Sequence, residues 1–182
     1  MTENKAIRLK IYFERDNDIE RVVDIDSQST LEDLHLTILA AFEFSAGEMA
    51  SFWLCNNMWE REQEVPMIRI KDEESQEECA SMSDVETIGA INNERRFLIY
   101  EYDMLLMWVL RIEFIEIVNQ IEGMEYPVLV ADKGTVPNAD EARGKLLMNS
   151  SEDDAEESDM FKEGGGFDDY DIDDIESEYS DY

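Results

Sequence analysis

Apolar and polar residues alternate at the start of the chain, as they do in a strand with one buried face. Within residues 6–13 the apolar positions recur at every second residue: Ile7, Leu9, Ile11 and Phe13. Residues 15–18 supply turn chemistry, and residues 19–26 place Ile19, Val23 and Ile25 on one face. Because the connection is short, we predict an antiparallel β-hairpin.

The apolar period changes from two to about 3.6 after Ser29, which indicates an amphipathic helix. Its apolar stripe consists of Leu31, Leu34, Ile38, Ala41 and Phe42. Thr30 is placed to cap this helix, with Asp33 completing a capping box. We expect the helix to end at residues 45–47 and to cover the hairpin.

Four further segments have the composition of strands. Three of them are rich in aromatic and β-branched residues, and they span 51–55, 95–102 and 107–116. A turn at residues 103–106 joins the last two, and residues 126–131 are predicted to add a final edge strand.

Residues 56–82 are charge-rich, and we interpret them mainly as loop. Within them, residues 65–70 are predicted to form a short edge strand. Ser83 and Glu86 have the spacing of a second capping box, ahead of a short helix of about two turns.

This order of elements predicts an α+β fold. We expect a mostly antiparallel or mixed sheet covered by one main helix, with an element order like that of the ubiquitin-like β-grasp fold. Residues 1–148 are predicted to form the compact domain, and residues 149–182 a separate tail. Fold class alone does not assign a function.

The net charge is the most unusual property of the composition. The 182 residues include 46 acidic and 15 basic side chains, for a formal net charge of −31. Such a surface repels nucleic-acid phosphates and anionic lipids, and it favours basic protein surfaces. The sequence therefore argues against direct binding of nucleic acid or membrane.

The tail concentrates this charge and is expected to be disordered on its own. Residues 149–182 contain fifteen acidic residues, one basic residue (Lys162) and three consecutive glycines at 164–166. A segment of this composition cannot bury enough apolar surface to offset its conformational entropy.

The sequence has neither the pattern of a signal peptide nor that of a membrane span, so we expect a cytoplasmic protein. The N-terminal residues alternate in polarity where a signal peptide has a continuous apolar run, and no segment reaches the roughly 20 apolar residues of a membrane span. Cys55 and Cys79 are too few for a disulfide scaffold.

The residues with catalytic potential have no supporting motif. His35 is the only histidine, cannot hold a metal alone, and is interpreted as structural. Cys55 lies in an apolar strand, and Cys79 follows two glutamates, an environment that raises a thiol pKa. We predict no enzymatic activity, no cofactor and no metal site.

Aromatic and aliphatic side chains in acidic or polar surroundings are the predicted contacts for a partner. Trp59 follows Asn56 and Asn57 and is predicted to be an exposed anchor. In the tail, apolar anchors alternate with carboxylates: Phe167, Tyr170, Ile172, Ile175, Tyr179 and Tyr182. Such spacing suits a short motif that folds onto a groove rimmed by Lys and Arg. The alternative is a solvating tail without a dedicated partner.

Several blocks of the chain together resemble a known family. The helix start has Thr30, Leu31, Leu34 and His35, a strand end has Tyr100, Tyr102 and Asp103, and Gly134 precedes Pro137 by three residues. Over roughly residues 6–140 this pattern resembles the plasmid pRiA4b ORF-3-like family. The resemblance implies a compact α+β domain of uncharacterised activity.

The chain departs from the family pattern at polar positions. Met49 stands where the family usually has a histidine, residues 104–107 lack the usual Gly-Asp pair, and Val109 and Leu110 replace a second histidine. If relatives use those groups for a ligand or metal, this chain has lost most of them.

Three functional hypotheses follow, with the oligomeric state left open. The favoured one is a non-enzymatic interaction domain whose acidic-aromatic tail binds a basic protein surface. The second is a small-ligand binder or enzyme with a pocket near His35, Tyr102, Asp103 and Trp108. The third is a nucleic-acid mimic that competes for a DNA-binding protein.

Overall fold

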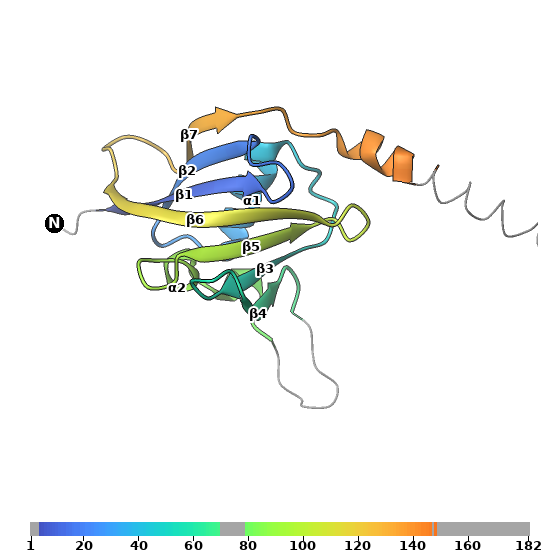
Figure 1. The fold of residues 1–182 in the computed structure, drawn as a ribbon. Coiled ribbons are helices and arrows are strands. Elements are labelled where there is room, and N and C mark those ends of the chain that lie inside the picture. Colours follow the sequence, from blue (N-terminus) through green and yellow to red (C-terminus); the bar gives the residue numbers. More distant parts are fainter. Residues whose placement is uncertain (1–3, 70–78, 147, 149–182) are drawn as a thin grey trace, which may run out of the picture. The chain divides into compact units, whose positions relative to one another are not determined.

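Seven antiparallel strands form a single sheet in this protein. The structure, a computed structural model, describes residues 4–69, 79–146 and 148. The chain divides into two units, Met1–Arg143 and Gly144–Tyr182, and the first contains the sheet, in the order β4-β3-β5-β6-β1-β2-β7 (Figure 1). The α+β class is confirmed. The predicted tail lies outside the described residues, and the β-grasp comparison stays an analogy.

The predicted hairpin is confirmed as β1 (Lys5–Phe13) and β2 (Glu20–Asp26). Their register pairs Ile7 with Ile25 and Leu9 with Val23. All four side chains are buried, because the period-two pattern places them on the same face of the sheet.

The predicted helix is confirmed as α1 (Leu31–Phe42). Asp33 N donates to Thr30 Oγ1 at 3.3 Å, and Thr30 N donates to Asp33 Oδ2 at 2.8 Å, so the capping box is complete. The helix packs on one face of the sheet (Figure 1), and its apolar stripe joins the hydrophobic core.

Three strands in the middle and one at the edge were also predicted correctly. They are β3 (Ala50–Cys55), β5 (Phe97–Tyr102), β6 (Trp108–Asn119) and the edge strand β7 (Val128–Lys133). The β5–β6 hairpin and the β3–β5 pairing are antiparallel. The turn between β5 and β6 forms one wall of the pocket described below.

The other edge strand, β4 (Arg61–Pro66), corrects two predictions. It lies four residues earlier than the predicted strand at 65–70, in a stretch interpreted as loop. Its first four side chains are exposed, whereas Val65 is buried in the core. An edge strand needs only backbone pairing on one side, and charged side chains are typical of such edges.

The second capping box was assigned to the wrong residues. Asp84 Oδ2 accepts from Ser81 N at 2.9 Å and from Ser81 Oγ at 2.7 Å, at the start of the 3-10 helix η1 (Met82–Asp84). Helix α2 (Thr87–Ala90) is a single turn without a side-chain cap. Val85 and Glu86, which lie between η1 and α2, have an extended backbone. Backbone hydrogen bonds from Leu31 N to Val85 O and from Thr87 N to Ser29 O hold this segment beside the start of α1.

The two faces of the sheet differ in how they are covered. Helix α1 covers the face that carries the core, and no helix among the described residues of Met1–Arg143 covers the other, which we call the open face (Figure 1). The open face carries half-buried polar and aromatic side chains such as Arg8, Lys10 and Trp53. Any binding site on this face is therefore formed by strand side chains and the loops beside them.

Candidate functional site

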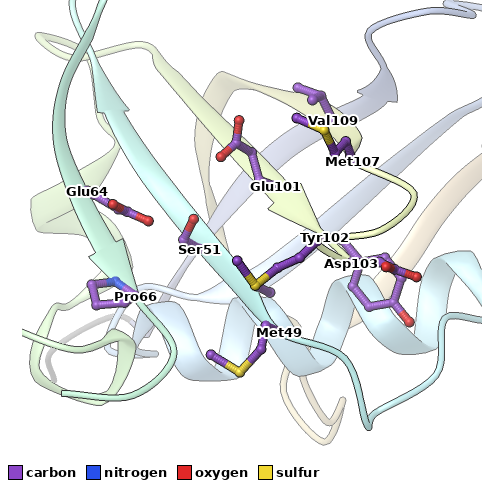
Figure 2. A pocket seen from close by; sticks show the side chains of 11 residues that line it. Met49, Ser51, Glu64, Pro66, Glu101, Tyr102, Asp103, Met107 and Val109 are labelled. Carbon is purple, nitrogen blue, oxygen red and sulfur yellow. The ribbon is translucent and has the colours of Figure 1, made fainter. Parts of the chain in front are cut away.

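A pocket of about 310 Å³ lies on the open face, where β3, β4 and β5 meet the β5–β6 turn (Figure 2). Its lining is mainly apolar, with a few acidic and hydroxyl groups. Ligand pockets in proteins have about 300–1,000 Å³ and a similar mixture. This pocket is at the small end of that range.

Strand register builds the floor of the pocket. Ser51 on β3 is paired with Pro66 on β4 and with Glu101 on β5, and Glu101 is paired with Val109 on β6. Directly paired residues on one face of an antiparallel sheet have Cβ atoms about 4.5–5.5 Å apart. Four neighbouring strands thus contribute adjacent side chains to one floor.

Methionine side chains form the apolar wall. Met104 is 81% exposed, Met107 67% and Met49 42%, although all three line the pocket. Thioether side chains are unbranched and polarizable, and they adapt to differently shaped apolar groups. Exposed methionines gathered around a hollow are a feature of adaptable binding surfaces.

Asp103 fixes the turn that carries Met104 and Met107. Its carboxylate accepts from Leu105 N at 2.8 Å and from Leu106 N at 3.1 Å. Arg143 Nε and Nη2 donate to Oδ2 at 3.0 and 2.6 Å. Both ends of the turn, Asp103 (φ 62°) and Met107 (φ 48°), have left-handed backbone conformations, and Met107 N donates to Asp103 O at 2.7 Å.

These contacts keep the Asp103 carboxylate ionised. Burial acts to raise the pKa of Asp103, but hydrogen bonds from Arg143 and the two backbone amides outweigh it and lower the pKa below its ordinary value. Arg143 also pairs with Glu48 at 2.5 Å. Asp103 therefore organises the wall of the pocket, and its carboxylate is already engaged.

Glu101 is likewise engaged, whereas two other polar groups of the pocket have no partner among the described residues. Glu101 accepts from Trp53 Nε1 at 2.9 Å and pairs with Arg61 Nη2 at 2.5 Å. Ser51 is only 9% exposed, and neither its hydroxyl nor the Glu64 carboxylate bonds with any described residue. Figure 2 shows the Ser51 hydroxyl on the sheet surface beside Glu64 and Glu101.

The predicted combination of His35 with Asp103 does not occur around this pocket. Tyr102 and Asp103 line it, but neither His35 nor Trp108 is a lining residue. His35 is buried on α1, and its Nδ1 lies 2.8 Å from the Tyr100 hydroxyl. Burial lowers the pKa of His35 and raises the pKa of Tyr100, so this buried pair is neutral.

Trp59 lies elsewhere on the domain. It is half-buried, adopts a left-handed backbone conformation (φ 66°), and stacks on Phe97 with ring centroids 4.2 Å apart. The Arg111 guanidinium lies 4.8 Å from its ring centroid. Its role as a partner contact stays a prediction, and so does that of the six tail anchors, which lie outside the described residues.

The remaining reactive groups do not converge on the pocket. Cys55 is buried, and burial raises the pKa of its thiol, whereas Cys79 is exposed. Within the described ranges, no three His, Cys, Asp or Glu side chains are arranged to hold a metal ion. No helix in this described part is both long and apolar enough to cross a membrane.

Part of the pocket was identified from the sequence: Tyr102 and Asp103 line it as predicted, and Met49, Met104, Met107 and Val109 lie at positions where the chain departs from the family pattern. The strand residues Ser51, Glu64 and Glu101 were missed. Ser51 has the pattern of an ordinary strand residue, and Glu64 that of a charged loop. The methionines gave a further signal in the sequence, because a turn containing Met104 and Met107 next to Asp103 departs from the polar composition of most turns.

The fold and the pocket together define a class of protein: an α+β domain with one sheet, one covered face and a small pocket on the other. The sequence profile of the Plasmid pRiA4b ORF-3-like protein family matches residues 5–178. The chain belongs to this family, as predicted from its motifs.

A solved structure shares the fold. It is the crystal structure of MM3350, a protein of unknown function from Methanosarcina mazei Go1, with a TM-score of 0.66 and 19% sequence identity, covering 92% of this chain and 94% of that chain. No protein among the curated sequences compared matches this chain.

Proposed function

We propose that this protein is an interaction domain that binds a basic segment of another protein. The observation that supports this most directly is the pocket on the open face, with methionine walls and a carboxylate at its edge, Glu64, that has no partner among the described residues. A protein with a net charge of −31 attracts basic partners over distances of about a Debye length.

The acidic tail is proposed to take part in the same interaction. Its carboxylates steer the basic segment toward the domain, and its anchors dock afterwards: Phe167, Tyr170, Ile172, Ile175, Tyr179 and Tyr182. Electrostatic steering raises the association rate, whereas buried aromatic anchors contribute most of the affinity. Trp59 is proposed as a further contact on the domain.

We further propose that the protein is cytoplasmic, with its cysteines reduced, and that it contacts protein rather than nucleic acid or membrane directly. The charge favours that choice of partner, since phosphates are repelled by the same carboxylates that attract lysine and arginine.

A small-ligand binder is the second candidate, because the pocket next to Asp103 is concave and has the size of a small-molecule site. Asp103, which lines the pocket, is bonded to Arg143, and His35, which does not line it, is bonded to Tyr100. We therefore favour binding of a protein segment.

The experiment is a titration of the full-length protein, labelled with ¹³C at its methionine methyl groups, with short synthetic peptides. Peptides rich in lysine and arginine are compared with acidic peptides of the same length. We expect saturable binding of basic peptides only, with shifts of the Met49, Met104 and Met107 methyl signals and an affinity that falls as salt is added.

The contribution of the tail is tested in the full-length chain. Replacing Tyr170 and Tyr179 with serine removes two anchors and keeps every charge, so affinity should fall while its salt dependence persists. Basic peptides that fail to saturate, or that bind without moving the three methyl signals, would overturn the proposal. Competition by DNA for the same partner would instead indicate a nucleic-acid mimic.

A further inference from the structure

We propose that the pocket on the open face binds the side chain of a lysine residue in the partner, an inference that rests on the proposed function. The pocket combines an apolar wall with two polar groups that have no partner among the described residues, Ser51 and Glu64. A lysine side chain has the matching parts, a four-carbon stem and an ammonium group.

The polar end of the pocket presents hydrogen-bond acceptors that the described residues leave unused. Ser51 is nine-tenths buried as a residue, and its hydroxyl makes no hydrogen bond with any described group. No fully buried polar side-chain atom of the described residues lacks a partner, so this hydroxyl oxygen is accessible to solvent. A ligand that covers this hydroxyl without bonding to it leaves a buried polar group unpaired, which weakens binding by about tenfold or more. A ligand that donates to Ser51 is therefore favoured, and a second donor on it can reach the Glu64 carboxylate.

Three acceptors come from three neighbouring strands. Ser51 lies on β3, Glu64 on β4 and Glu101 on β5; Glu101 is directly paired with Ser51, and Glu64 is paired with the Trp53 position two residues along β3. Glu101 already accepts from Trp53 and is paired with Arg61, so its negative charge is largely compensated and Glu64 carries the uncompensated charge at this end. Such an arrangement accepts donors from several directions.

This geometry favours lysine over arginine. An ammonium group has three rotatable donors and no acceptor, which suits acceptors spread around a point. A guanidinium group is a planar fork that pairs best with both oxygens of one carboxylate. Because one acceptor here is a hydroxyl on the floor of the pocket, the ammonium group fits the set better.

The apolar stem of the ligand contacts the rest of the lining. Met49, Met104 and Met107 form the adaptable wall, and Pro66 and Val109 lie on the sheet on either side of the Ser51–Glu101 pair. Long cationic side chains bury their methylene groups against apolar surface while their charged end reaches polar groups. The volume of about 310 Å³ is sufficient for one long side chain.

The test uses the full-length protein with ¹³C-labelled methionine methyl groups and two matched pairs of probes. n-Pentylamine is compared with n-pentanol, and a basic peptide with one central lysine is compared with the same peptide carrying norleucine there. We expect the amine and the lysine peptide to shift the Met104 and Met107 methyl signals, and the lysine peptide to bind about tenfold more tightly than the norleucine peptide.

Two variants locate the ammonium group. Ser51→Ala and Glu64→Gln should each weaken binding of n-pentylamine by about tenfold, which corresponds to the loss of one hydrogen bond to a charged group. Glu62→Gln is the matched control, because it removes the same charge from the same strand outside the pocket lining. It should leave the affinity for n-pentylamine unchanged.

The outcomes separate this inference from the proposed function. If basic peptides saturate and shift the methyl signals but norleucine binds as well as lysine, the lysine assignment is wrong and the proposed function stands. If n-pentylamine binds and no basic peptide saturates, the proposed function fails and the pocket is a site for small amines. Equal effects of Glu62→Gln and Glu64→Gln would show general attraction of cations and overturn the lysine assignment.

Discussion

His35 and Tyr100 illustrate how a residue with catalytic potential can have a structural role. The histidine is buried on the helix, and its Nδ1 is 2.8 Å from the Tyr100 hydroxyl on the central strand β5. One hydrogen bond thus joins the covering helix to the middle of the sheet, across the core. A buried polar pair of this kind is stable while both groups are neutral.

This pairing predicts a pH dependence of stability that belongs to one residue. Burial lowers the pKa of His35 below its ordinary value of 6.5, so the unfolded chain binds a proton more readily than the folded one. The stabilising contribution is complete above pH 6.5 and is lost as pH falls from there toward the lowered pKa. The slope is expected to reach at most about 1.4 kcal/mol per pH unit.

Urea unfolding at a series of pH values between neutrality and the onset of carboxylate titration measures this slope. Since His35 is the only histidine in the chain, His35→Gln should remove most of the slope in that window. A variant that retains the full slope would show that another group is responsible. Tyr100→Phe serves as a comparison, because it deletes the hydroxyl and retains the histidine.

At the scale of elements, the sequence predicted those that have a strong apolar period. The hairpin, the capped helix and the strands at 51–55, 95–102 and 107–116 all have an apolar face that the core requires, so the pattern identifies them. Strand β4 was displaced in the prediction because its first four side chains are exposed and only its backbone pairs with β3. Backbone pairing at a sheet edge therefore does not require an alternating apolar pattern in the sequence.

The pocket was not predictable for a related reason. Its floor depends on register: Ser51 is adjacent to Glu101 and Pro66 only after β3 is placed between β4 and β5. Pro66 and Glu101 are 15 and 50 positions away from Ser51 in the sequence. Local patterns do not contain that information, whereas the family motifs did indicate the Tyr102–Asp103 strand end beside the pocket.

The Gly-x-x-Pro motif at residues 134–137 has a physical explanation at this scale. Gly134 has a left-handed backbone conformation (φ 75°), and a Cβ atom placed on it would lie 2.4 Å from the backbone oxygen of Asp18. Glycine therefore allows the end of β7 to approach the turn between β1 and β2. Arg21 Nη1, which donates to Lys133 O at 2.8 Å, strengthens the same junction.

We predict that Gly134→Ala destabilises the domain more than Gly123→Ala. Gly123 is also left-handed (φ 82°), but a Cβ atom placed on it would meet no atom within 4 Å, so its substitution costs only the conformational strain of about 1–2 kcal/mol. At Gly134 the steric conflict with backbone adds about 1–3 kcal/mol. Urea unfolding of both variants gives the difference, and equal losses would contradict the close approach.

At the scale of the whole molecule, the chain combines a stable core with a large excess of negative charge. The described ion pairs are mostly at the surface, such as Lys10 with Glu20 at 3.0 Å and Lys133 with Asp18 at 2.6 Å. Exposed pairs of this kind contribute little to stability. With 46 acidic and 15 basic residues, most carboxylates have no basic residue to pair with, so repulsion between like charges is the larger electrostatic effect.

This balance predicts that added salt stabilises the protein. Sodium chloride screens the repulsion within the folded chain, so the free energy of unfolding should rise between low ionic strength and a concentration at which the Debye length falls to a few ångströms. Urea unfolding at several salt concentrations measures the change, and magnesium chloride at matched ionic strength is the control for specific cation binding. A stability that falls with sodium chloride would mean that the surface ion pairs outweigh the repulsion. That result would also weaken the case for basic partners, because the same unscreened carboxylates that destabilise the free protein are proposed to attract them.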